Sequence, residues 1–194
     1  MNDLCVDIGW QSLNHDGEQL CGDHVDIIEP DENSTIVVLA DGLGSGVKAS
    51  ILSTLTSKII STMMANGLSL EDCVETIAAT LPICSERKVA YSTFTIIHIV
   101  NNEEAEIIQY DNPHVILLRD GENIEYPEIE MNIGGKKIYK SRVRLNENDI
   151  FIAMSDGCPH AGVGMSLNFG WKREDIIEFM KTFYFVGYTA KTLT

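Results

Sequence analysis

The sequence predicts an α+β domain in which two antiparallel sheets pack together with helices on the outside. Candidate strands come first, two helices and many closely spaced strands follow, and one helix closes the chain. This order lacks the regular alternation of strand and helix that builds a parallel sheet. Turn signals such as Asn101-Asn102 and Asp120-Gly121 separate the middle strands, as is typical of antiparallel hairpins. With 194 residues and 44% apolar side chains, the chain suits a single domain, residues 1–194.

The N-terminal part should contain three strands. Leu4 to Trp10 alternates between apolar and other residues, a period typical of a strand with one buried face. A second short strand is expected to follow Gly22 and to run through Ile28. Thr35 to Ala40 is an apolar run and indicates a buried strand.

Two helices should follow and pack against each other. Val47 to Ala65 has helical periodicity and ends at Asn66-Gly67, a common helix stop. Its expected inward-facing residues are Leu52, Leu55, Ile59 and Met63. The second helix runs from Ser69 to about Leu81 and begins with a capping-box pattern, Ser69 to Asp72. Because the link is short, the two helices should be antiparallel and cover one outer face.

The middle and the end of the chain complete the two sheets. The alternating and apolar segments there are predicted as an antiparallel meander and two further strands: Tyr91 to Val100, Glu104 to Tyr110, Val115 to Arg119, Asn123 to Tyr126, Lys137 to Leu145 and Asp149 to Met154. A last helix is expected over Lys172 to Tyr184.

Composition excludes several classes of function. The formal net charge is −15, which disfavours nucleic-acid binding. No run is long enough to span a membrane and no signal peptide starts the sequence, so we expect a cytoplasmic protein without a membrane partner. The five cysteines include no Cys-x-x-Cys pair, which argues against a disulfide framework. The spacing also does not support a zinc site assembled from Cys5, Cys21, His24, Cys158 and His160.

Three acids stand where strands begin or end. Asp23, Asp41 and Asp156 each adjoin a glycine. If these strand ends converge, the carboxylates offer oxygen ligands that suit magnesium, manganese or calcium, and Gly42 can add its backbone carbonyl. Two alternatives remain at this point. The acids can belong to three ordinary turns, or residues 42–46 can be a phosphate loop, although no Gly-Lys-Ser/Thr follows.

An ordered set of motifs resembles a known family. The motifs are Gly22-Asp23, Asp41-Gly42-Leu43-Gly44-Ser45-Gly46, Tyr91-Ser92-Thr93-Phe94, Asp111-Asn112-Pro113 and Ser155-Asp156-Gly157. Together they resemble the metal-dependent protein phosphatases of the protein phosphatase 2C superfamily, and within it the bacterial branch typified by stage II sporulation protein E. The resemblance implies a four-layer α-β-β-α sandwich, two manganese or magnesium ions, and hydrolysis of phosphoserine or phosphothreonine on a protein substrate.

The resemblance also implies a role for each acid. Asp41 would bridge both ions, Asp23 and the Gly42 carbonyl would hold one of them, and Asp156 would hold the other. A metal-bridging hydroxide would be the nucleophile. Leu43 stands where many eukaryotic relatives have a histidine, so the group that protonates the leaving oxygen is unassigned.

The C-terminal region departs from the family pattern. The family carries a further metal-binding aspartate before a last strand, but beyond Asp156 the sequence has only Asp175, in the expected first turn of the last helix. We therefore expect a chain truncated before that strand. A catalytically weak or inactive phosphatase-like module that binds metal or a phosphoprotein is the alternative function. The sequence indicates neither the substrate protein nor the oligomeric state.

Overall fold

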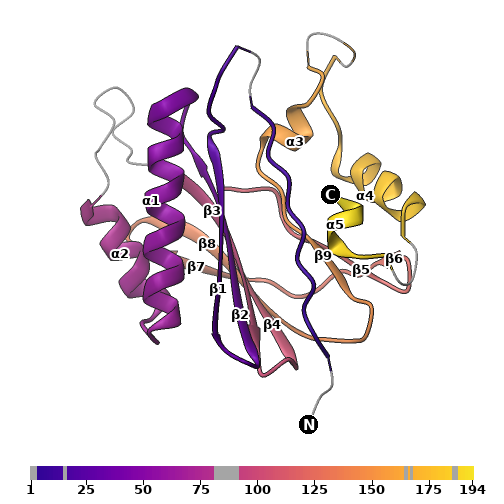
Figure 1. The fold of residues 1–194 in the computed structure, drawn as a ribbon, viewed down its shortest axis with the longest axis horizontal. Helices are drawn as coiled ribbons and strands as arrows, with labels where there is room; N and C mark the ends of the chain where they lie inside the picture. Colours follow the sequence, from indigo (N-terminus) through magenta and orange to yellow (C-terminus); the bar gives the residue numbers. More distant parts are fainter. Residues whose placement is uncertain (1–3, 15–16, 81–91, 164–165, 167, 185–187) are drawn as a thin grey trace.

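The structure, a computed structural model, describes residues 4–14, 17–80, 92–163, 166, 168–184 and 188–194. Its main elements form four layers: two helices, a six-stranded sheet, a three-stranded sheet and a further helix (Figure 1). The helices are α1 (Gly46–Ala65), α2 (Leu70–Thr80), α3 (Gly157–His160), α4 (Arg173–Thr182) and α5 (Ala190–Leu193). None of these described helices combines the length and apolar content that a membrane crossing needs.

Both sheets are antiparallel. The larger sheet has the order β1-β2-β3-β4-β8-β7 and the smaller one has the order β6-β5-β9. Their strands are β1 (Asp23–Asp31), β2 (Ser34–Gly42), β3 (Ser92–Val100), β4 (Glu104–Tyr110), β5 (Ile116–Arg119), β6 (Glu122–Asn123), β7 (Ile129–Ile133), β8 (Lys136–Arg144) and β9 (Ile150–Ile152).

Apolar side chains fill the space between each pair of layers. The first core joins α1 and α2 to the larger sheet and includes Ile60, Val74 and Ile96. The second lies between the two sheets, where Ile107 of β4 and Leu117 of β5 are fully buried. The third joins β5 to α4 and includes Ile116, Leu118, Ile176 and Ile177. The predicted α+β sandwich of two antiparallel sheets flanked by helices is therefore confirmed.

The predicted hairpin turns are present. Asn101 and Asn102 have φ of 54° and 51° between β3 and β4, and Asp120 and Gly121 have φ of 52° and 78° between β5 and β6. Two successive residues with positive φ match the twist of the flanking strands, and asparagine, aspartate and glycine adopt that conformation most readily.

The start of α2 is also as predicted. The Ser69 Oγ accepts from the backbone N–H of Asp72 at 3.1 Å, and the Asp72 carboxylate accepts from the backbone N–H of Ser69 at 3.2 Å. This reciprocal pair is the predicted capping box. The helix continues to Thr80, and the predicted end at Leu81 lies outside the described residues.

The predicted first strand, Leu4 to Trp10, is not a strand. Val6 and Trp10, which the alternation placed on a buried face, are 40% and 53% exposed. The segment instead lies against α5, where Asp7 Oδ2 accepts from the backbone N–H of Ala190 at 2.7 Å. An extended segment without a ladder partner gains no sheet hydrogen bonds, so alternation alone was insufficient evidence.

The middle strands do not form one continuous meander. After β4 the chain crosses to the smaller sheet for β5 and β6, and it returns to the larger sheet for β7 and β8. The sequence prediction also missed β7, Ile129–Ile133. Its five residues alternate between apolar and polar side chains. It is the edge strand of the larger sheet, and Ile129 at its start is 68% exposed while Ile133 at its end is buried.

Helix α1 buries most of the predicted face and further residues beside it. Leu52 is buried and Ile59 and Met63 pack against the core, but Leu55 is 42% exposed. Small and polar residues make up much of the inward face: Ala49, Ser53, Thr56, Ser57 and Ser61. These small side chains let the helix lie close to β1 and β2, and polar groups of β1 meet them, as where His24 Nδ1 and Ser57 Oγ are 2.8 Å apart.

The polar contact between β1 and α1 predicts a stability effect. Asp26 is only 6% exposed and accepts hydrogen bonds from Lys58 Nζ, at 2.5 Å, and from Ser61 Oγ. We expect Asp26→Ala to lower the free energy of unfolding by about 2 kcal/mol because it leaves the buried Ser61 hydroxyl without this acceptor. Chemical denaturation measures the change, and the exposed Glu29→Ala on the same strand is the control. Equal stability of the two variants would contradict this account.

Candidate metal centre

The hairpin of β1 and β2 brings two of the three predicted acids together. Asp23 opens β1 and Asp41 lies near the end of β2, and the two residues are direct antiparallel partners. The backbone N–H of Gly42 donates to the Gly22 carbonyl at 3.0 Å and continues the pairing beyond them. Neighbouring side chains of such a pair lie on the same face of the sheet, so both carboxylates belong to one site.

The third acid comes from the other sheet. Asp156 follows β9 and immediately precedes α3. The preceding residue, Ser155, is buried and donates its hydroxyl proton to Asp23 Oδ2 over 2.7 Å. This contact ties the segment after β9 to the start of β1. The centre therefore lies where the ends of both sheets meet.

The carboxyl groups of Asp23 and Asp156 both influence the pKa of Asp41. Partial burial, and then the negative charges of Asp23 and Asp156, raise the pKa of Asp41 from 3.8 to about 7. Three acids that share one site cannot all ionise without repulsion, and a bound cation would remove that penalty.

Gly42 has a packing role that the sequence did not reveal. A Cβ at this position would lie 1.9 Å from the Ala49 carbonyl oxygen in the first turns of α1. Only glycine therefore lets the end of β2 approach the helix this closely. The sequence indicates Gly42 only as a source of a carbonyl ligand.

Other groups position the acids, and the sequence analysis gave them no role. Ser92 Oγ donates to the Asp41 carbonyl at 2.8 Å. Thr93, the direct partner of Asp41 on β3, donates its hydroxyl proton to Asn112 Oδ1 over 2.5 Å. Asn112 is buried and donates in turn to Thr95 Oγ1 at 3.2 Å. The quoted motifs contained Ser92, Thr93 and Asn112, but only the fold shows that they meet.

The donor set fits hard divalent cations, but few of its side chains can hold the same ion. Its oxygens come from Asp23, Asp41 and Asp156, and such donors suit magnesium or manganese. Asp23 and Asp156 both act on Asp41, but among the described residues no three His, Cys, Asp or Glu side chains are arranged to hold a single ion. Asp175 lies in the first turn of α4, where its carboxylate accepts from the backbone N–H of Lys172 at 3.4 Å.

The glycine-rich segment is poorly suited to phosphate. Ser45 Oγ donates to Glu18 Oε1 at 3.0 Å, and Glu18 Oε2 lies 2.8 Å from the point where a Cβ added to Gly46 would lie. A carboxylate at the start of α1 would repel a phosphate group there. The phosphate-loop alternative therefore loses support.

The raised pKa of Asp41 predicts a pH dependence for the metal-free protein. The folded state holds a proton up to about pH 7, whereas the unfolded carboxyl group loses it near its usual pKa. Stability should therefore fall as the pH rises from about 4 to about 7, because the folded state binds the extra proton. Denaturation in EDTA at pH 5 and pH 8 measures the change, which should shrink in Asp41→Asn. An unchanged pH dependence in that variant would assign the proton to another group.

Solved structures with this arrangement of layers include several phosphatases. The phosphatase domain of SpoIIE from Bacillus subtilis, with a fragment of its regulatory domain, has a TM-score of 0.73 and 17% identity, covering 95% of this chain and 55% of that one. RsbX in complex with magnesium has a TM-score of 0.59 and 21% identity, and the match covers 93% of this chain and 87% of RsbX. The serine/threonine phosphatase of S. agalactiae has a TM-score of 0.58 and 14% identity, and the match covers 96% of this chain and 86% of that one.

These identities show a shared fold, and the chain spans about half of the longer SpoIIE chain. No functionally curated protein matched the sequence. The sequence profile of one family, described as Stage II sporulation protein E (SpoIIE), matches residues 31–182. The matched region includes Asp41, Gly42 and Asp156, and Asp23 lies just before it. With most of its length matched, the chain belongs to the Stage II sporulation protein E family.

Proposed function

We propose that this chain is a metal-dependent serine/threonine phosphatase domain that acts on phosphorylated proteins. The observation that carries the proposal is that Asp23 and Asp156, from different sheets, both act on Asp41, whose pKa is raised to about 7 by burial and then by these two charges. Such a perturbed carboxyl group, supported by neighbouring charges, is typical of a functional site. Family membership and the likeness to solved phosphatases support this reaction class.

We assign the roles by position. Asp41, whose pKa is raised by both Asp23 and Asp156, would contact two manganese or magnesium ions. Asp23 and the Gly42 carbonyl would hold one ion, and Asp156 would hold the other. When bound, two such ions supply an activated water and neutralise charge on the phosphoryl group.

The remaining residues of the centre orient these ligands. Ser155 donates to a carboxylate oxygen of Asp23, and Ser92 donates to the backbone carbonyl of Asp41. The first contact fixes the orientation of a proposed ligating carboxylate, and the second holds the main chain that carries Asp41. These hydroxyl groups act on the ligands and make no contact with substrate in this proposal.

A weak or inactive module that binds metal or a phosphoprotein is the second candidate. Two observations favour it: no group of three ligating side chains surrounds one position in the described parts of the chain, and Leu43 has no proton to donate. Fewer carboxylates would hold at least one ion less tightly.

Phosphate release from a phosphoserine peptide distinguishes the two candidates. We expect release in manganese or magnesium and none in EDTA, with metal binding followed by calorimetry in parallel. Binding of metal without release of phosphate would favour the second candidate over the first. Release that persists in EDTA would contradict both.

A further inference from the structure

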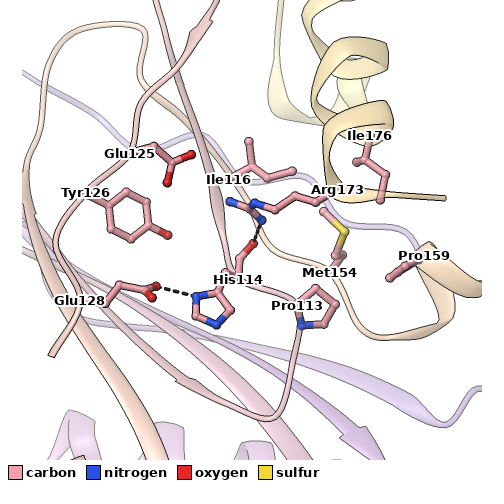
Figure 2. A pocket seen from close by; sticks show the side chains of 10 residues that line it. All are labelled: Pro113, His114, Ile116, Glu125, Tyr126, Glu128, Met154, Pro159, Arg173 and Ile176. Atoms are coloured by element: carbon pink, nitrogen blue, oxygen red, sulfur yellow. Dashed lines mark hydrogen bonds and ion pairs between the residues drawn. The ribbon is translucent and has the colours of Figure 1, made fainter. Parts of the chain in front are cut away.

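A cavity of about 320 Å³ lies between β5, α4 and the segments around α3 (Figure 2). Its volume is at the lower end of the range for ligand sites. Apolar side chains form much of its wall: Pro113, Ile116, Met154, Pro159 and Ile176. Figure 2 shows Glu125, Tyr126 and Glu128 on the side opposite Met154, Pro159 and Ile176. The cavity therefore has an apolar side and an acidic side.

Most polar groups of the cavity already have partners in the fold. Arg173 donates to the backbone carbonyls of His114 and Val115, with 3.3 Å between Nη2 and the Val115 oxygen. Glu128 lies 2.7 Å from His114 Nδ1 and accepts from Gln109 Nε2 at 3.1 Å. These contacts hold α4 and the segment before β5 in place, so the guanidinium group of Arg173 is directed toward the protein.

Glu125 shares its exposure with Glu128 and has a partner close in sequence. It accepts from Asn123 Nδ2 at 2.7 Å, and its residue is exposed at the acidic side of the cavity. A carboxylate can accept several hydrogen bonds at once. Glu125 can therefore receive a cationic side chain that enters from solvent.

The cavity adjoins the candidate metal centre through two segments. Met154 and Pro159 line it and lie on either side of Asp156 in the chain. Pro113 follows Asn112, whose side chain accepts a hydrogen bond from Thr93. Thr93 is the β3 partner of Asp41. A peptide whose phosphorylated residue lies at the three aspartates therefore has this cavity as a neighbouring surface.

We propose that this cavity binds the segment of the phosphoprotein substrate that flanks the phosphorylated residue. An apolar side chain of that segment would occupy the wall formed by Ile116, Met154 and Ile176, and an adjacent lysine or arginine would pair with Glu125. This inference rests on the proposed phosphatase function and adds a sequence preference to it. An acidic flank is disfavoured by Glu125 and Glu128 and by the net charge of −15.

Binding of unphosphorylated peptides tests the preference separately from catalysis. Two peptides of equal length, each with a central serine, are compared by calorimetry with metal-free protein. In the first peptide leucine and arginine flank the central serine on both sides. In the second peptide serine replaces each leucine and glutamate replaces each arginine. We expect about tenfold tighter binding of the leucine–arginine peptide, from burial of the leucine and pairing of the arginine. Glu125→Lys should remove most of this difference.

A matched variant separates local recognition from general charge attraction. Glu32→Lys makes the same charge change at an exposed residue in the β1–β2 turn, at the end of the hairpin opposite Asp23 and Asp41, and should keep the preference. Equal binding of the two peptides to the wild type, or equal loss of preference in both variants, would overturn the proposal. Because no hydrolysis is measured, that result leaves the phosphatase function standing. If the protein prefers the leucine–arginine peptide but does not hydrolyse the phosphoserine form of either peptide, the binding role of the cavity is supported and the phosphatase function is not.

Discussion

Asp41→Asn is expected to abolish metal-dependent phosphatase activity, with a loss of more than about 100-fold. Replacing groups that merely orient a metal ligand commonly costs 10- to 100-fold, and Asp41 is proposed to contact both ions directly. The change removes one negative charge from the centre, where Asp23 and Asp156 lie beside it. Phosphate release from a phosphoserine peptide in manganese measures activity, and calorimetry measures manganese affinity.

The same substitution at Asp120 is the control for Asp41→Asn. Asp120 is exposed in the β5–β6 turn with φ of 52°, a conformation that asparagine accepts readily. Asp120→Asn should retain manganese affinity and activity. Wild-type manganese affinity in Asp41→Asn would show that Asp41 bridges no ions, whatever the activity.

Gly42→Ala should lower the free energy of unfolding by more than about 3 kcal/mol, or prevent folding. The added Cβ would lie 1.9 Å from a backbone oxygen of α1, and a backbone atom of a packed helix cannot move aside as a side chain can. The end of β2 or the start of α1 would have to shift, which also displaces Asp41. Chemical denaturation measures the loss.

Gly22→Ala is the matched control for this packing argument. Gly22 pairs with Gly42, and a Cβ there would meet the Ala49 Cβ at 3.4 Å, an ordinary contact. We expect a change of less than about 1 kcal/mol, because such a contact needs little adjustment. If Gly42→Ala were as stable as Gly22→Ala, the close approach of β2 to α1 would not constrain residue 42.

The acids of the candidate centre could be singled out from sequence because their setting is local. Asp23, Asp41 and Asp156 each stand beside glycine at a strand terminus or just beyond one, and the turn chemistry is visible in the residues themselves. Their proximity depends on how two sheets meet, which no local pattern contains. The family resemblance supplied that expectation, and the contact of Ser155 with Asp23 came from the fold alone.

Other features could not be predicted because they depend on partners distant in sequence. In α1 the spacing of leucine and isoleucine predicted an apolar inner face, but the inner side of the helix also carries serines, which meet His24 and Asp26 of β1. The pairing of Thr93 with Asn112 likewise joins two motifs across strands. By contrast, β7 could have been found, since Gly134 and Gly135, with φ of 58° and 78°, mark the turn that follows it.

The central claim is that Asp23, Asp41 and Asp156 form a site for divalent cations. Anomalous diffraction from crystals soaked in manganese tests it most directly. The account predicts manganese in contact with the Asp41 carboxylate, with Asp23 on one side and Asp156 on the other. Density for manganese only at other surface acids, with these three carboxylates bare, would contradict it.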